Sequence, residues 1–556
     1  MAPSRPEPAH ETARPSGWRQ LADARAAASF GAIEVLSIPL FIFWGRHWWF
    51  WADDWDFLAT RTGWNAKDVF RGHYQHWTTL PVLAYRALWF VFGLHSYVPY
   101  QLLVIVAHLV AAALLRLVMR RAGVRPWIAT LTALVFVFFG SGAENILIAF
   151  QVTFVGSLVF GLTQLLLADH DGPLDHRDWL GVLAGLAGLM CSGVALAMTI
   201  IVGLAMLLRR GWRIALVHTA PLAAAYLIWS SFSPKGRSAG AYRADSPLQV
   251  IKFVAIGIGS AFGRLAQIPG LGFVFAAMMV VGLILVFRAE GPGALRGRLA
   301  VPIALLVGAL VFLVVTGLAR SGQSGPLANA IGTGPARARQ SRYVYLIAAM
   351  ALPALALAVD AVVRGRRRLA IPVVALLVVG VPGNIRELAT FTNRSSEGRQ
   401  AFRTAVLEAP RLPLARELPR SSQPAPPRTF AGLTLGWLLD SLPSGRIPAP
   451  RGLTSAEIAT LTLHLALRPG KVPLSLGCRR FTKPVTVVLG NLQRITLESG
   501  SSTIEYLPTA GDSSPPELFL PSTFKSFVDG SLRLRIEPGG GAPIVLCTPA
   551  KPIAAP

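Results

Sequence analysis

Long apolar runs alternate with short polar segments over residues 30–383 of the chain. Each run comes near the roughly 20 residues that an α-helix needs to cross the hydrocarbon core of a bilayer. This pattern predicts a mainly α-helical, polytopic membrane protein. About eleven transmembrane helices are expected, at residues 30–46, 98–119, 127–140, 147–168, 179–191, 194–208, 214–231, 271–287, 299–317, 343–361 and 369–383.

Basic residues in the short loops between these runs set the expected orientation. Arginines gather at residues 116–125, 208–213, 287–298 and 364–368. Cytoplasmic loops of membrane proteins carry an excess of Lys and Arg, so these loops are expected inside the cell. We therefore expect a multi-pass protein of the plasma membrane, with residues 1–29 as a cytoplasmic tail and the C-terminus outside.

Composition agrees with this assignment. The chain has 556 residues, of which 53% are hydrophobic and 15% are charged. Soluble proteins are about 25% charged. The formal net charge of +25 would suggest a nucleic-acid partner in a soluble protein. Here topology accounts for much of that charge, and no nucleic-acid partner is expected.

One further apolar run, at residues 248–267, is long enough to span the membrane. Counting it as a span would move Arg288, Arg296 and Arg298 to the outer side, against the positive-inside rule. We therefore predict an interfacial or re-entrant helix. Its glycines do not form a dinucleotide-binding loop, because the spacing is wrong and no strand precedes them.

The composition changes after residue 383, and residues 384–556 are expected to form a small extracytoplasmic α+β domain. Residues 453–467 have helical spacing, with a start signal at Thr454. Residues 483–508 and 531–547 alternate between apolar and polar positions and contain turn residues, which predicts β-hairpins.

Two of the three cysteines, Cys478 and Cys547, lie in that C-terminal domain. An oxidising compartment outside the membrane permits a disulfide between them. Two buried free thiols are the alternative. Cys191 belongs to a membrane segment.

Residues 47–97, the first outside loop, hold the densest polar chemistry of the chain. The stretch WADDWDFL places Asp53, Asp54 and Asp56 just after the first span, among interfacial tryptophans. Amphipathic segments later in the loop can lie flat on the bilayer and cover these carboxylates. A partly desolvated carboxylate is a candidate general base for a hydroxyl group. Alternatively, the aspartates mark the end of a span in water.

Further polar residues are expected on the same outer side. His73 and His76 are candidates for hydrogen bonding to a substrate, and on a helix their spacing would put both on roughly one face. A divalent metal held by them and the aspartates is the less favoured alternative, so no cofactor is predicted. Glu144 and Gln151 either line the ligand pocket or, in the case of Glu144, pair with an arginine.

Cations also occur on the outer side, where topology does not explain them. They include Lys235, Arg237, Arg320 and Arg342, and Tyr343 follows the last of these. Arginine forks bind phosphate well, so an anionic ligand at the outer membrane face is the favoured interpretation. The alternative is contact with lipid headgroups or nearby carboxylates.

The motifs DDWDFL, HYQHWTTLPVLAYR, AENILIAFQVTFVGSL and SRYVYL, with this architecture, resemble the GT-C superfamily of membrane glycosyltransferases. They are similar to uncharacterised actinobacterial members related to arabinofuranosyl- and mannosyltransferases. The resemblance covers about residues 30–383, which it implies to be the catalytic module. It implies that Asp53, the first acid of the pair, is the base, with Asp54 in the second place. The pair Asp-Asp departs from the Asp-Glu of mannosyltransferases, so which residue acts stays open.

The resemblance implies an inverting transferase that takes a sugar from a polyprenyl-phosphate donor. The acceptor would be a cell-envelope glycan, a lipid or a protein at the outer membrane face. Two alternatives stay open. One is a lipid or glycan transporter without catalysis, although ionisable residues near the middle of spans are scarce. The other is a ligase or polymerase of the same superfamily that uses lipid-diphosphate donors.

Overall fold

The computed structural model divides the chain into two compact units. The helical unit contains Met1–Arg46, Phe70–Pro81 and Tyr100–Thr392, and the mixed unit contains His47–Val69, Val82–Pro99 and Asn393–Pro556. The first outside loop is thus shared between the units. The structure describes residues 17–233, 243–322, 334–393, 396–425, 430, 432–469, 476–489, 494–497, 501–506, 517–519, 522–526, 532–538 and 544–549.

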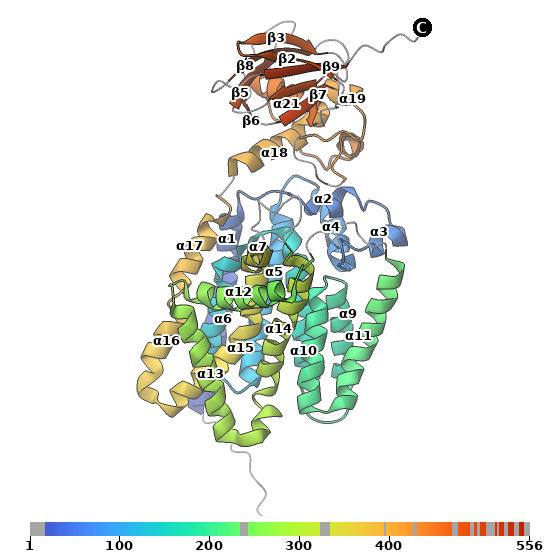
Figure 1. Ribbon diagram of the computed structural model, residues 1–556. Helices are drawn as coiled ribbons and strands as arrows, with labels where there is room; N and C mark the ends of the chain where they lie inside the picture. Colours follow the sequence, from blue (N-terminus) through green and yellow to red (C-terminus); the bar gives the residue numbers. More distant parts are fainter. Residues whose placement is uncertain are drawn as a thin grey trace, which may run out of the picture. The chain divides into compact units, whose positions relative to one another are not determined.

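The helical unit is built almost entirely of long apolar helices (Figure 1). The most enclosed of them is α15 (Ser341–Gly365), which packs against α13 and α14 and is buried along most of its length. The remaining helices of this unit are α1 (Gly17–Gly45), α6 (Pro126–Val137), α7 (Ala143–Leu147), α8 (Val152–Ala168), α9 (His176–Leu189), α10 (Val194–Arg209), α11 (Trp212–Phe232), α12 (Pro247–Ala266), α13 (Leu271–Glu290), α14 (Ala300–Arg320), α16 (Ala370–Val378) and α17 (Val381–Phe391), together with α5 (Val98–Arg121) except its first two residues.

The helical unit is that of a multi-pass membrane protein. Within the described residues, nine helices are long and apolar enough to cross a bilayer, or ten if one bent pair counts as a single span. This is fewer than the eleven predicted. The predicted spans at 179–191 and 194–208 form helices of 14 and 16 residues, which are shorter than a full span. The run at 248–267, in contrast, forms a helix that is long and apolar enough to cross a bilayer.

Two of the predicted spans are interrupted. The α6 helix ends at Val137, and the next helical segment, Gly140–Leu147, is bent from it by 47°. The predicted span 369–383 consists of α16 and the start of α17, separated at Val379 and Gly380. Pro382 enters the first turn of α17, where its ring fits a helix start but not a continuous helix. Hydropathy averages over such breaks, so the pattern alone could not find them.

The α12 helix runs across the long helices of this unit rather than along them (Figure 1). It packs against α13, α14 and α15. This direction is the one expected of an interfacial helix, although its length and hydropathy would also allow a span. Its orientation in a bilayer stays a prediction.

The mixed unit combines loop residues with the C-terminal part of the chain. It contains α2 (Asp54–Ala59) and most of α4 (Thr79–Phe92), which begins in the helical unit, and most of α3 (Ala66–Phe70). Its later helices are α18 (Ser396–Glu408), α19 (Leu414–Glu417), α20 (Leu435–Ser441) and α21 (Ser455–Ala466). The predicted helix start at Thr454 is confirmed by a capping box. The backbone N–H of Glu457 donates to Thr454 Oγ1, and the N–H of Thr454 donates to Glu457 Oε2.

Two antiparallel sheets follow α21 (Figure 1). The five-stranded sheet has the order β1-β7-β4-β9-β2, and the four-stranded sheet has the order β3-β8-β5-β6. These strands are β1 (Leu467–Pro469), β2 (Leu476–Phe481), β3 (Val485–Leu489), β4 (Arg494–Leu497), β5 (Ser501–Tyr506), β6 (Glu517–Phe519), β7 (Ser522–Ser526), β8 (Leu532–Pro538) and β9 (Ile544–Pro549).

Strands were predicted in the right places, but the predicted hairpins are wrong. Consecutive strands β3 and β4, β4 and β5, and β8 and β9 belong to different sheets. Alternating polarity identifies a strand that has one buried face, but it does not say which strand pairs with it. The chain therefore changes sheet where a local hairpin was expected.

The register of β2 and β9 places Cys478 directly opposite Cys547. Directly opposed residues of an antiparallel pair have Cα atoms about 4.5–5.5 Å apart, within the range of Cα separations found in disulfides. The backbone pairing is thus compatible with the predicted disulfide, which stays a prediction.

Candidate active site

The acidic segment of the first outside loop turns sharply and then becomes helical. Ala52 has a positive φ of 48°, which is rare for a residue other than glycine. Asp53 then occupies the N-cap position of α2 and is half-buried. The turn separates the environments of Asp53 and Asp54, although they are neighbours in the sequence.

Asp54 is completely buried. Its Oδ2 accepts a hydrogen bond from the backbone N–H of Trp51 at 2.8 Å, and its Oδ1 accepts one from the Tyr85 hydroxyl at 2.5 Å. Burial raises the pKa of the Asp54 carboxyl from 3.8 to about 7, against the lowering effect of these two hydrogen bonds. Both oxygens of Asp54 therefore have partners within the mixed unit.

Asp56 faces a cation instead. Its Oδ2 lies 2.8 Å from Nη2 and 3.1 Å from Nε of Arg61, whose side chain is 1% exposed. The Thr60 hydroxyl donates to Oδ1 of Asp56 at 2.6 Å. Arg86 in turn donates to the Arg61 carbonyl oxygen at 2.6 and 3.0 Å. The predicted substrate ligand Asp56 thus takes part in a network that fixes the loop.

The sequence analysis did not predict that Tyr85 contacts the acid pair. Tyr85 lies on α4, within the segment predicted to be an amphipathic helix that covers the carboxylates. Its ring is buried and packs edge-on against Phe57 at 5.3 Å, and its hydroxyl reaches Asp54. The amphipathic spacing indicated the helix, but not which side chain would meet an aspartate.

His73 and His76 belong to the helical unit, and they are not on a helix as the spacing argument assumed. Each backbone N–H donates to the carbonyl oxygen of the other at 2.9 Å, which closes a tight turn. Tyr74, inside the turn, has a positive φ of 52°. His76 Nδ1 accepts a hydrogen bond at 3.1 Å from the N–H of Gly193. The turn thereby fixes the backbone of both histidines, and the bond from Gly193 orients the His76 ring.

The predicted ligand Gln151 lies close to this turn. Its neighbour Phe150 packs edge-on against the His73 ring at 5.2 Å. Gln151 is buried, and its Oε1 has no hydrogen-bond partner among the described residues. The side-chain amide of Asn145 on α7 is also buried, and neither of its polar atoms has such a partner. Buried unpaired polar atoms are costly, which marks this stretch as a candidate for binding a polar ligand.

Glu144 and Arg342 both lie next to Ser341, which directly precedes Arg342 in the chain. The N–H of Glu144 donates to Ser341 Oγ at 3.3 Å. The Arg342 guanidinium donates to Gln340 Oε1 at 2.8 and 3.1 Å and lies 5.5 Å from the Tyr343 ring. The structure therefore brings two predicted ligands, Glu144 and Arg342, to one end of α15.

The remaining predicted ligands of this group are Tyr343, Arg320, Lys235 and Arg237. Tyr343 is buried, with its ring 6.0 Å from that of Phe312, which is a packing role. Arg320 ends α14 and is half-buried. Lys235 and Arg237 lie outside the described residues.

A different group has ligand atoms close enough together to share a metal ion: His170, Asp175 and Asp178. Asp178 already accepts hydrogen bonds from Arg210 at 2.5 Å and from His218 at 3.0 Å. These bonds give the group a structural role, joining the ends of neighbouring helices. No member of it was predicted as a site residue.

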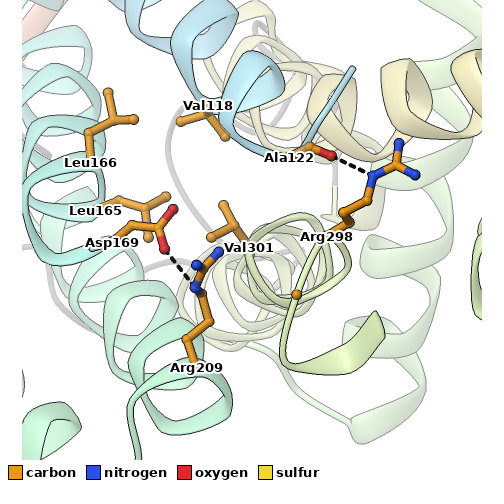
Figure 2. Close-up of a pocket in the computed structure, with 9 residues that line it drawn as sticks. Val118, Ala122, Leu165, Leu166, Asp169, Arg209, Arg298 and Val301 are labelled. Atoms are coloured by element: carbon orange, nitrogen blue, oxygen red, sulfur yellow. Dashed lines mark hydrogen bonds and ion pairs between the residues drawn. The ribbon is translucent and has the colours of Figure 1, made fainter. Parts of the chain in front are cut away.

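A pocket in the helical unit lies between the ends of α5, α8, α10 and α14 (Figure 2). Arg209 contacts Asp169 at 2.8 Å there, and Arg298 donates to the Ala122 carbonyl oxygen at 2.9 Å. The residues that line it belong to segments next to the basic loops predicted to be cytoplasmic. None of the predicted site residues that the structure describes lines this pocket.

No protein-family model and no curated protein sequence matches the chain. Among solved structures, the crystal structure of ArnT from Cupriavidus metallidurans bound to undecaprenyl phosphate is similar, with a TM-score of 0.43 and 15% sequence identity. The match covers 81% of this chain and 88% of that chain.

Proposed function

We propose that the protein is an inverting membrane glycosyltransferase of the GT-C type. It transfers a sugar from a polyprenyl-phosphate donor to a cell-envelope glycan, lipid or protein at the outer membrane face. The observation that carries this proposal is the acid pair after the first span, in which Asp54 is completely buried and Asp53 is half-buried.

The environments of the two aspartates support a division of roles. Asp54 is completely buried, and both its oxygens already accept hydrogen bonds. Asp53 is half-buried and begins α2. A general base must reach the proton that it removes, so Asp53 is the base in this proposal. Asp54 is a positioning residue that ties Trp51 to Tyr85 and so fixes the turn that carries Asp53.

In the proposed reaction, the acceptor hydroxyl gives its proton to Asp53 while its oxygen attacks the anomeric carbon. The bond between that carbon and the phosphate oxygen breaks, and the sugar inverts. The transition state resembles an oxocarbenium ion, as in glycoside hydrolysis. Arg342 and Arg320, together with Lys235 and Arg237, are the proposed cations that stabilise the departing phosphate.

The remaining predicted ligands are assigned to substrate binding. His73, His76 and Gln151, gathered around the closed turn, would hydrogen-bond sugar hydroxyls, and Glu144 lies on the neighbouring helix. Asp56 supports the loop through Arg61. A lipid monophosphate surrounded by cations can leave without a metal, so none is assigned to the reaction.

The orientation follows from the loop charges. The N-terminal tail and the basic loops are placed in the cytoplasm, and the acid loop and the C-terminal domain are placed outside. In this arrangement the donor enters from the outer leaflet, with its polyprenyl tail along the helical unit.

Transfer by the purified protein tests the proposal. The full chain in lipid would be given radiolabelled decaprenyl-phosphate arabinose or polyprenyl-phosphate mannose, with a crude cell-envelope acceptor. Label in the acceptor supports the transferase and identifies its donor. If the protein binds both labelled lipids but transfers neither sugar, the transporter alternative takes its place. Transfer from a lipid-diphosphate donor would favour the ligase alternative.

A further inference from the structure

We infer that Arg399, Phe402, Phe430, Gly432 and Trp437 of the C-terminal region are part of the acid site, where Phe402 and Trp437 are positioning residues for the loop that carries Asp53. These residues precede the two sheets in the sequence. The catalytic part of this inference rests on the proposed function, whereas the structural part does not.

Phe402 on α18 is the centre of the contact. Its side chain is 4% exposed. Its ring lies 5.2 Å from the ring of Trp51, 6.1 Å from that of Trp49 and 6.3 Å from that of Trp55, each in an edge-on arrangement. Aromatic pairs at these separations are attractive beyond the area that they bury. A single C-terminal residue therefore packs against the loop on both sides of Asp53 and Asp54.

Two further aromatic residues of the C-terminal region extend this contact. Phe430 packs edge-on against Trp51 at 5.1 Å and against Phe402 at 5.3 Å. Trp437 on α20 lies 6.2 Å from Trp55 of α2 and 5.2 Å from Trp89 of α4. Trp437 thus joins the helix that begins at the acid pair to the helix that supplies Tyr85.

The backbone approaches closely at a glycine. Gly432 has a φ of 75°, and a Cβ atom there would overlap the Thr60 methyl group and lie 3.0 Å from the backbone of Ala59. Ala59 and Thr60 form the end of α2. The residue at position 432 therefore has to be glycine for the C-terminal segment to lie against this helix.

The start of the loop is held by a cation. The guanidinium of Arg399 lies 4.4 Å from the ring centre of Trp48, and its Nε donates to the carbonyl oxygen of His47 at 3.4 Å. A cation over the face of a tryptophan is attracted to the ring electrons, most strongly when both are shielded from water. Arg399 is itself buried. The C-terminal segment thus contacts the loop from His47 to Thr60.

These contacts explain how an unfavourable turn is maintained. Ala52 holds a left-handed conformation directly before the acid pair, which persists only where the surrounding structure enforces it. All the C-terminal residues involved precede α21 and both sheets.

Hydrogen exchange of the full-length protein in lipid tests the structural part of the inference. Phe402→Ala should raise exchange at least tenfold in peptides covering residues 47–60, with exchange in α14 unchanged. Phe402→Leu, which keeps an apolar side chain, should restore part of the protection. Leu534→Ala is the matched control, because Leu534 is a completely buried residue of β8. It should raise exchange in β8 and leave residues 47–60 as in the wild type.

Transfer assays on the same variants test the catalytic part. Phe402→Ala should lower kcat at least tenfold, and Leu534→Ala should leave it within twofold of the wild type. Unchanged exchange in residues 47–60 of Phe402→Ala would overturn the inference, even if the wild type transfers sugar. Increased exchange with unchanged kcat would overturn the positioning role. A wild type that transfers nothing would remove the proposed function, while the exchange result would still decide whether Phe402 holds the loop.

Discussion

Asp53 and Asp54 show how much the surroundings decide what a residue can do. The two side chains are chemically identical and adjacent, yet Asp54 is fully enclosed and Asp53 is half-buried. Asp54 accepts hydrogen bonds from Tyr85 and Trp51. The enclosed carboxyl is costly to ionise, because the buried charge loses its hydration. The protein thus maintains an energetically unfavourable group next to its candidate base.

The raised pKa of Asp54 gives a pH dependence of stability. In the unfolded chain this carboxyl titrates near 3.8, and in the folded protein near 7. Well below pH 3.8 it is protonated in both states and costs nothing. As the pH rises from 4 to 7, the folded state loses on the order of 4 kcal/mol, at 1.36 kcal/mol per pKa unit. Asp54→Asn should therefore melt at a progressively higher temperature relative to the wild type as the pH rises from 5 to 8.

Thermal unfolding of both proteins across this range measures the effect. Asp171→Asn is a suitable control, because the Asp171 side chain is fully exposed. The explanation by burial fails if the difference between Asp54→Asn and the wild type is the same at pH 5 and pH 8.

At the scale of elements, one polar network in the helical unit joins the break after α6, the end of α12 and the start of α17. Asn384 of α17 accepts a hydrogen bond from the N–H of Ser141, in the break after α6. Gln267, at the left-handed end of α12, donates to Ser141, Asn384 and Glu387. Helix breaks leave backbone groups without helical partners, and the buried Asn384 side chain bonds two of them here, the N–H of Ser141 and the carbonyl oxygen of Arg264.

The contact between α12 and α17 makes a prediction about glycine. A Cβ atom on Gly380 would overlap the carbonyl oxygen of Leu265, so Gly380→Ala should destabilise the protein by about 1–3 kcal/mol through overpacking. Gly259 also lies in α12, but open space surrounds its Cβ position. Gly259→Ala should stabilise the protein by about 0.5–1 kcal/mol, since alanine favours a helix. Thermal unfolding of both variants checks the pair, and equal shifts would argue against the close contact.

How far the sequence predicts this structure depends on the kind of signal. Apolar runs gave the helices, and the capping residue Thr454 gave the start of α21, because these signals are local. The sequence analysis did not predict the breaks at Val137 and Gly380, because they depend on polar groups from other helices. It did not predict which strands pair, because strand pairing also depends on residues far apart in the sequence. In the candidate site, the acid pair was visible in WADDWDFL, but Tyr85 and Phe402 were not, because long-range packing brings them to it.

At the scale of the whole molecule, the oxidation state of the two C-terminal cysteines tests whether the C-terminal domain lies outside the membrane, as proposed. Cys478 and Cys547 are opposite in the register of β2 and β9, and an oxidising compartment would join them. The denatured protein isolated without reductant should then bind one equivalent of maleimide, at Cys191, and three after reduction. Three equivalents before reduction would argue against both the disulfide and the outside location. Loss of the disulfide should cost about 2–5 kcal/mol of stability in this domain.

The most direct test of the central claim is the turnover number for sugar transfer by Asp53→Asn, measured beside Asp54→Asn and the exposed control Asp171→Asn. Removing a general base typically costs 10²- to 10⁴-fold, so Asp53→Asn should lose about 10³-fold in kcat with unchanged binding of the lipid donor. Asp54→Asn should lose about tenfold, and Asp171→Asn should match the wild type. Full turnover by Asp53→Asn, or a larger loss in Asp54→Asn, would contradict the assignment of Asp53 as the base.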